Sequence, residues 1–406
     1  MNNNIVHTKS WKLFCIYYFI VAIYSLVGSP FWHLEELYMP FAIFGISTLF
    51  YVFHNNWFRV QYRSVAIWAI VALLLGTVGN VNGYIVAFLR MLPFLFFLLL
   101  EDGLKMALYE FIRKWLAILL GFSIIFWIPQ IMGKPLLPGF PDYYGAWSEK
   151  FGDFGYIFEN HFLYVVNLRR LHDYVLRFSS IFLEPGYLGC FLSTILFVEE
   201  FKIKKWYNLI FLIALILTFS LAGWLVFGVG IFFLQMMNSS NRVFKLLLLF
   251  ASLCLFDYVF STLNGGDNVV NEFILERMKY DSSTGTIEGY NRTEEAFDEW
   301  FRGFLFTSDV LFGNPTQYQT LWSDSVNVGW KYYVACNGFV GLLAYILYLL
   351  SVVRVNGSKY LGFSMMILMI LIFSRGQFFN FSSLFMIIYF VGIYKLTNNE
   401  IIQYEQ

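Results

Sequence analysis

The chain has 406 residues, with 27 basic and 27 acidic side chains, 59% hydrophobic residues and a mean hydropathy of +0.62. Only 13% of the residues are charged, whereas a soluble domain carries about 25%. A water-soluble fold could not cover so much apolar surface, so the composition predicts an all-α integral membrane protein. The balanced charge gives no indication of nucleic-acid binding. The four cysteines lie singly in apolar stretches, which favours buried thiols over a metal cluster or a disulfide framework.

Apolar runs of about twenty residues are long enough to cross the hydrocarbon core of a membrane. About twelve runs approach this length, so residues 1–406 are predicted to form a single polytopic membrane domain. The first run follows a polar start without a small-residue cleavage site and is expected to stay uncleaved. The predicted spans are residues 12–31, 37–54, 64–79, 83–100, 114–132, 180–198, 206–220, 222–237, 243–262, 330–352, 359–373 and 377–395.

The distribution of lysine and arginine predicts the orientation of these spans, because cytoplasmic loops are enriched in both. If the N-terminus is cytoplasmic, every inside segment contains at least one of them, and the short outside turns contain only Arg375. Both termini are therefore expected in the cytoplasm. The inside residues are Lys9, Lys12, Arg59, Arg63, Lys105, Arg113, Lys114, Lys202, Lys204, Lys205, Arg242, Lys245, Arg354, Lys359 and Lys395.

Two outside segments are too long for simple turns: the first loop, residues 133–179, and the second loop, residues 263–329. Long connections without evident strands are usually functional or disordered, and the many Tyr, Phe and Trp residues argue against disorder. The first loop balances its charges overall but ends in a basic stretch. The second loop has an excess of acidic residues, which fits a sugar-binding surface better than an anion site.

Residues 291–305 of the second loop predict an amphipathic helix, with Asn291 or Thr293 as its cap. Its apolar stripe is expected to pack on the spans or at the lipid surface. Arg292 lies near the start of this helix, which is the unfavourable end for a cation. It is either a functional residue or an ordinary exposed arginine. The stripe consists of Phe297, Trp300, Phe301, Phe304 and Leu305.

The end of the first loop leads into a Glu-Pro-Gly sequence, Glu184-Pro185-Gly186. Proline suits the first position of a helix, so the helix is predicted to begin near Pro185 and to leave residues 179–183 irregular at membrane depth. The free N–H groups and the dipole of such a helix start suit a phosphate. Arg177 precedes this segment. Two alternatives remain: Glu184 caps a kinked helix, and Arg177 extends to the interface as a snorkelling side chain.

Arg90 lies inside the predicted fourth span. A charged side chain in lipid costs roughly 3 kcal/mol or more, so an arginine there indicates a function and a partner. Arg90 could reach a phosphate near the outer leaflet. The alternative is an internal pair with a carboxylate such as Asp257.

Three short motifs are similar to those of bacterial O-antigen and capsule polymerases of the Wzy type. The run from Arg177 to Gly189 resembles the motif that these proteins carry before a central span, and 218–223 (Thr-Phe-Ser-Leu-Ala-Gly) resembles the small-residue motif of the following span. Residues 311–315 and 337–343 resemble the end of that family's second large loop. Spacings from Arg170 to Gly186 and from Arg292 to Gly303 are also similar to those of some members. The resemblance covers most of residues 60–395.

The resemblance implies a glycosyltransferase of the bacterial inner membrane. Such enzymes transfer a glycan chain on undecaprenyl pyrophosphate to the terminal hydroxyl of an incoming lipid-linked repeat unit. The sequence shows no metal-ligand cluster, so we expect neither a metal nor another cofactor. The expected partners are the lipid-linked oligosaccharide, membrane lipid and a chain-length regulator protein. The candidate catalytic residues are Arg177, Glu184 as base or orienting group, and Arg292, and the candidate substrate-binding residues are Arg90, Arg169, Arg170, Pro185 and Gly186.

Two other classes remain as alternatives. O-antigen ligases share the lipid-linked donor but resemble a plan with one dominant outer loop and a late histidine, whereas all five histidines here precede residue 173. A flippase or other transporter would favour internal repeats and polar groups at the membrane midplane, whereas this sequence shows no repeat, few midplane charges and two large outer loops.

Overall fold

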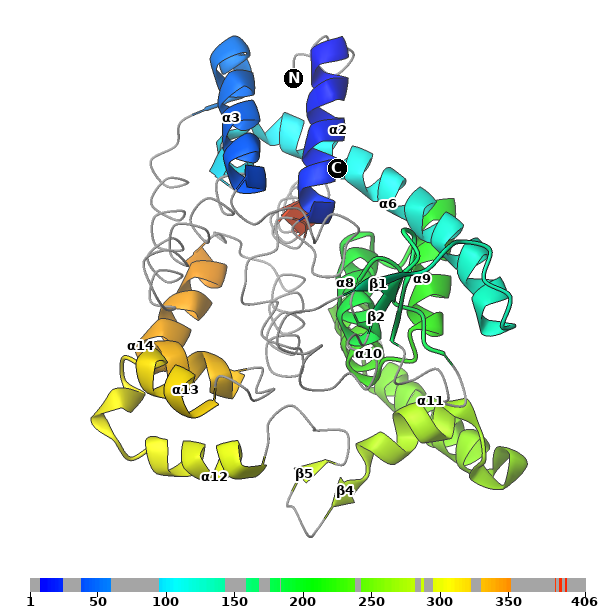
Figure 1. The fold of residues 1–406 in the computed structure, drawn as a ribbon. Coiled ribbons are helices and arrows are strands. Elements are labelled where there is room, and N and C mark those ends of the chain that lie inside the picture. Colours follow the sequence, from blue (N-terminus) through cyan, green and yellow to red (C-terminus); the bar gives the residue numbers. More distant parts are fainter. Residues whose placement is uncertain are drawn as a thin grey trace. The chain divides into compact units, whose positions relative to one another are not determined.

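The computed structural model describes residues 8–24, 38–59, 95–142, 158–167, 176–182, 184–237, 242–281, 286–287, 295–322 and 330–351, and residues 384, 387, 388, 391 and 392. This part of the chain is mostly helical (Figure 1). The longer helices are α2 (Lys9–Tyr24), α3 (Tyr38–Phe53), α6 (Asp102–Ile131), α8 (Pro185–Val198), α9 (Trp206–Leu217), α10 (Leu221–Met237), α11 (Arg242–Thr262), α12 (Glu295–Phe304), α13 (Pro315–Trp322) and α14 (Trp330–Ser351).

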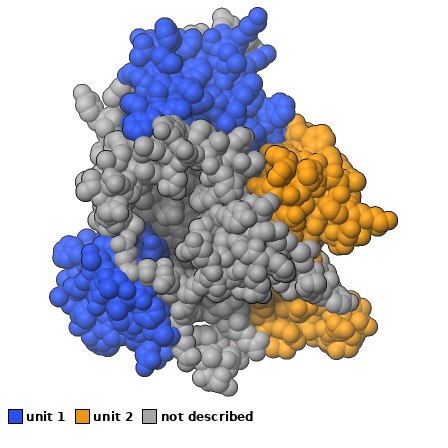
Figure 2. All heavy atoms as spheres, viewed as in Figure 1, with its two compact units in different colours: residues 1–116, 293–355, 375–395 blue, residues 117–292, 356–374, 396–406 orange. Residues whose placement is uncertain are grey.

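The chain divides into two compact units (Figure 2). Unit 1 comprises residues 1–116, 293–355 and 375–395, and unit 2 comprises residues 117–292, 356–374 and 396–406. Unit 2 therefore contains α8 to α11, together with the described parts of the first loop and the beginning of the second. Unit 1 contains α2, α3 and α12 to α14.

Most predicted spans that fall on described residues coincide with helices. The predictions 37–54, 206–220, 222–237, 243–262 and 330–352 each match one helix to within a few residues. The division between α9 and α10 also falls where it was predicted. Among the described residues, α6 alone is long and apolar enough to cross a membrane, judged by length and composition. The spans 64–79 and 359–373 lie outside the described residues, as do most of 83–100 and 377–395.

The first loop contains a small sheet that the all-α prediction missed. Its strands are β1 (Phe140–Asp142), β2 (Phe158–Asn160) and β3 (Val165–Asn167), joined antiparallel in the order β1-β2-β3. Each strand has only three residues, which is too short for an alternating pattern to show in the sequence. The loop is ordered in this part, as its aromatic content predicted.

The sheet is fixed to the C-terminal half of α6 by side chains. The Ser123 hydroxyl donates to the Leu163 carbonyl at 2.6 Å, and the Tyr164 hydroxyl donates to Gln130 at 3.2 Å. Burial and the nearby Glu159 carboxylate raise the pKa of Tyr164, so its hydroxyl stays protonated. His161 is buried between β2 and β3, where its ring stacks on Tyr164. These contacts hold the end of the first loop against α6.

The second loop begins with the short helical segments η3 (Leu263–Gly266), η4 (Asn271–Leu275) and η5 (Glu276–Met278), and with the two-residue strands β4 (Tyr280–Asp281) and β5 (Thr286–Ile287). It continues with α12, the turn η6 (Ser308–Val310) and α13. The predicted amphipathic helix is α12, described from Glu295 onward.

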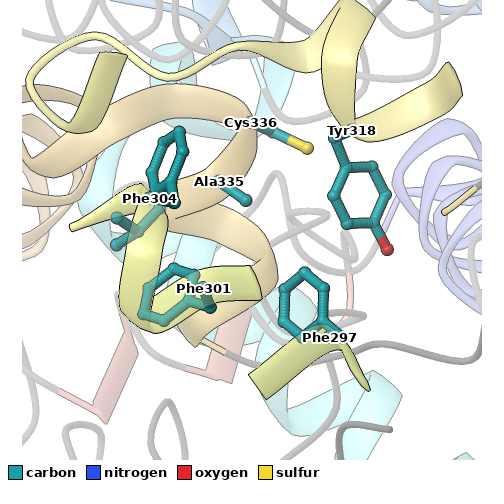
Figure 3. Close-up of a cluster of buried hydrophobic side chains, with 7 residues drawn as sticks. Phe297, Phe301, Phe304, Tyr318, Ala335 and Cys336 are labelled. Atoms are coloured by element: carbon teal, nitrogen blue, oxygen red, sulfur yellow. The ribbon is translucent and has the colours of Figure 1, made fainter. Parts of the chain in front are cut away.

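The apolar stripe of α12 packs on α13 and α14 (Figure 3). Its buried phenylalanines Phe297, Phe301 and Phe304 meet Tyr318 and the α14 residues 334–336, with Trp300 at the edge of this cluster. Leu305 is 37% exposed, so its predicted place in the stripe was wrong. It lies beyond the last residue of α12, where the helical spacing no longer holds. The stripe is thus covered by the second loop itself and by α14.

Two glycines join the end of the second loop to a break in α14. Gly338 interrupts the helix with φ 68° and ψ 178°, and Gly313 has φ 80°. A Cβ on Gly338 would overlap the Leu311 carbonyl, and one on Gly313 would overlap the Cys336 carbonyl. Asn314 N donates to Ala335 O at 2.8 Å, and Val340 N donates to Leu311 O at 3.0 Å. The backbones are in direct contact here.

Replacing Gly338 by alanine should destabilise unit 1. The backbone conformation at this position is almost restricted to glycine, and forcing another residue into it costs about 1–3 kcal/mol before the overlap with Leu311 is counted. We expect a lower thermal unfolding midpoint in detergent. Gly303→Ala is the matched control, because a Cβ at this α12 position meets nothing within 4 Å. Equal midpoints for the two variants would contradict the proposed role of Gly338.

Candidate functional site

The segment that precedes α8 is irregular, as predicted from Pro185, and its described residues are mostly buried. Phe178, Ser179 and Ser180 are each at most 4% exposed, and Ser180 has φ 49°. Phe178 N donates to Leu217 O at 3.0 Å, while Ser180 O accepts from Val165 N at 2.8 Å. The segment is thus held between the end of α9 and strand β3. The ring of Phe178 also packs edge-on against Trp127 of α6.

Helix α8 begins at Pro185, which confirms the predicted helix start. Glu184 precedes it in an extended conformation, with φ −138° and ψ 142°. Its carbonyl accepts from the N–H groups of Tyr187 and Leu188, but its side chain makes no capping hydrogen bond. Glu184 is therefore the N-cap residue of α8 by position, without a side-chain capping hydrogen bond. Glu184 is partly exposed at the start of α8.

Helices α8 and α10 run side by side in the same direction. Gly186 approaches Ser220, and further along the Ser193 hydroxyl lies 2.8 Å from both the Gly189 and the Gly223 carbonyls. A Cβ on Gly223 would lie only 2.8 Å from the Cα of Gly189. Glycine at both positions lets the two backbones touch, which brings the two helix starts together.

The start of α10 is capped by the motif at 218–223. The Ser220 hydroxyl accepts from Gly223 N at 3.1 Å, and the Thr218 hydroxyl accepts from Ser220 N at 3.3 Å while it donates to Leu215 O at 2.7 Å. Serine at this position is a favourable cap because it satisfies a first-turn N–H group. Within the described residues, the N–H groups of Gly186, Leu221 and Ala222 have no recorded acceptor.

The starts of α8 and α10 therefore lie close together, and Arg177 lies in the irregular segment that leads into α8. Each helix start contributes a positive dipole end and first-turn N–H groups, which favour an anion. Arg177 lies one residue before the buried Phe178. Its Nε is buried without a hydrogen-bond partner in the described structure, and its guanidinium lies 5.3 Å from the centre of the Phe273 ring. We call this place, formed by Arg177, Glu184, Gly186 and the start of α10, the α8–α10 site.

The predicted site residues fall into two groups. Glu184, Pro185 and Gly186 lie at the start of α8, and Arg177 lies in the irregular segment before it. The other predicted site residues lie outside the described residues; these are Arg90, Arg169, Arg170 and Arg292. The described residues contain no group of three potential metal ligands.

Sequence reasoning missed three residues that shape the α8–α10 site. Ser220 was visible as part of a quoted motif but was not assigned to the site. No local sequence pattern marks Ser193 or Phe273 as a site residue, because each shapes the site through a contact with a residue distant in the sequence. Comparison with protein-family models, curated proteins and solved structures gives no match.

Proposed function

We propose that this chain is a surface-polysaccharide polymerase that transfers an undecaprenyl-pyrophosphate-linked glycan chain onto the terminal hydroxyl of a lipid-linked repeat unit. The observation that carries the proposal is the close approach of the starts of α8 and α10, with Arg177 in the irregular segment that leads into α8. Both motifs that resemble the polymerase family, at 177–189 and at 218–223, meet at this one place.

The chemistry of the reaction fits such a place. The acceptor oxygen forms a bond with the anomeric carbon of the donor glycan, while the bond from that carbon to the diphosphate oxygen breaks. The diphosphate leaves with the bonding electron pair, so negative charge builds on it in the transition state. Fixed N–H groups, helix dipoles and Arg177 would stabilise this charge. Four further arginines remain proposed to bind the same diphosphate: Arg90, Arg169, Arg170 and Arg292.

Glu184 is the proposed base for the acceptor hydroxyl. It lies one residue before α8, and its side chain does not cap the helix. A carboxylate within hydrogen-bond reach of the hydroxyl can accept its proton as the new glycosidic bond forms. Orientation of the acceptor by the same carboxylate is the alternative role. Neither role requires a metal or another cofactor.

The proposed setting is a bacterial inner membrane, crossed about twelve times, with the loops 133–179 and 263–329 outside and both termini in the cytoplasm. The exposed apolar side chains of the helices support contact with lipid, because soluble monomers rarely expose large apolar patches. Helix α11 exposes more than half of each of Phe244, Leu247, Leu248, Phe250, Leu253 and Leu255. Helix α6 similarly exposes Phe122 and Ile125.

Deletion of the gene, followed by electrophoresis of surface polysaccharide, tests the proposed function. A polymerase defect leaves single-repeat material without a ladder. An unchanged ladder would contradict the proposal, and so would the loss of all surface repeats with a pool of lipid-linked repeats on the cytoplasmic side, which indicates a flippase. Full-length polymer that stays on its lipid carrier would indicate a ligase. Reporter fusions within 133–179 and 263–329 test the proposed orientation, which fails if these loops are cytoplasmic.

A further inference from the structure

The beginning of the second loop contacts the end of the first loop through one aromatic ring. Phe273, in the short π-helical turn η4, is 6% exposed and lies under the Arg177 guanidinium, with 5.3 Å between Cζ and the ring centre. Both residues belong to unit 2. They are 96 positions apart in the sequence, and the helices α8 to α11 lie between them.

The turn that carries Phe273 is fixed to the end of α11 by side-chain amides. Asn268 accepts from Asn271 N at 2.9 Å and donates to the Phe260 carbonyl at 2.6 Å. The Asn271 amide in turn donates to Gly266 O at 2.8 Å. The turn that carries Phe273 is therefore fixed to α11 by hydrogen bonds that do not involve Arg177.

The Arg177 Nε is buried without a hydrogen bond in the described structure, so the ring of Phe273 is the observed contact that can orient the guanidinium. An aromatic face attracts a guanidinium placed over it, and it limits the rotamers that a long arginine side chain can adopt. An arginine held in this way loses less conformational freedom when it binds an anion.

We propose that Phe273 is a positioning residue for Arg177, which makes the start of the second loop part of the diphosphate site. Phe273 touches neither the diphosphate nor the reacting atoms. Its ring holds the Arg177 guanidinium in the orientation that binds the diphosphate of the lipid-linked donor. This inference rests on the proposed function for the identity of the anion, and on the observed ring contact for the role of Phe273.

Binding of farnesyl diphosphate to the full-length protein in detergent tests this role. Phe273→Leu keeps an apolar side chain but removes the ring face, and it should weaken binding about fivefold. Phe273→Tyr keeps the ring face and should bind like the wild type. In an Arg177→Ala background, Phe273→Leu should cause no further loss, because the residue on which the ring acts is gone.

The double-variant comparison separates positioning from general structural damage. An equal loss from Phe273→Leu with and without Arg177 would show that the ring acts on the fold at large and would overturn the proposal. Unchanged binding by Phe273→Leu, or wild-type protein that does not bind farnesyl diphosphate, would also overturn it. Arg177-dependent binding with normal polysaccharide ladders after gene deletion would instead refute the polymerase function alone, and the role of Phe273 in a diphosphate site would stand.

Discussion

Replacing Gly223 by valine is expected to prevent α8 and α10 from packing together and to abolish most of the folded protein. A Cβ at this position would lie 2.8 Å from Cα and 2.9 Å from the carbonyl carbon of Gly189, and 3.2 Å from Leu215 Cδ1. The first two are backbone atoms, so no side-chain rotation can relieve the overlap. Overpacking of a core costs about 1–3 kcal/mol, and the two further carbons of valine add to this.

The separation of the helices would also break the hydrogen bond of Ser193 to Gly223 O and move the two helix starts apart. Gly223→Val should therefore lower both the amount of folded protein and any activity that depends on the α8–α10 site. The measurement is the yield of monodisperse protein in detergent, together with its thermal unfolding midpoint.

Gly228→Val is the matched control for this substitution. Gly228 lies on the same helix five residues later, is exposed, and has nothing within 4 Å of an added Cβ. Valine is also a better helix former than glycine, so the control should fold as well as the wild type. Wild-type yield and stability for Gly223→Val would refute the assigned role of this close approach.

The features that could be predicted from the sequence are those set by neighbouring residues. The start of α8 follows from Pro185, whose ring and missing N–H group act locally. The helices α3, α9, α10, α11 and α14 follow from long apolar runs bounded by polar residues. Helix α6 begins at Asp102, twelve residues before the predicted span at 114–132, because the prediction stopped at the charges of its first turns, whereas α6 includes them.

Features that depend on distant residues could not be predicted in this way. The contact of Gly189 with Gly223, the contact of Arg177 with Phe273 and the overlap that excludes a Cβ at Gly338 each join segments from different elements. The sequence shows the small or aromatic residue at such a position, but its partner depends on helix packing. The motifs at 177–189 and 218–223 were recognised separately, and only the fold brings them to one site.

Replacing Arg177 by alanine is expected to abolish polymer ladders while the protein accumulates to its normal level. The proposed reaction builds charge on the leaving diphosphate, and removal of one fixed donor from such a site costs about 10²–10³ in rate. Arg177 is partly exposed and its Nε makes no hydrogen bond in the described structure, so its loss should not unfold the segment. Electrophoresis of surface polysaccharide gives the first readout, and the amount of protein in the membrane gives the second.

Arg302→Ala is the matched control, because it makes the same substitution at an exposed arginine of α12, outside the proposed site. It should leave the ladders intact. Arg177→Lys keeps the charge but not the planar fork that binds a diphosphate through two N–H groups, so it should restore only part of the activity. Full ladders in the Arg177→Ala strain would remove this residue from the site, and the helix starts alone would then have to stabilise the leaving group. Full recovery of the ladders in the Arg177→Lys strain would mean that Arg177 acts through its charge alone. The orientation of a guanidinium would then not matter, and the proposed positioning role of Phe273 would fail.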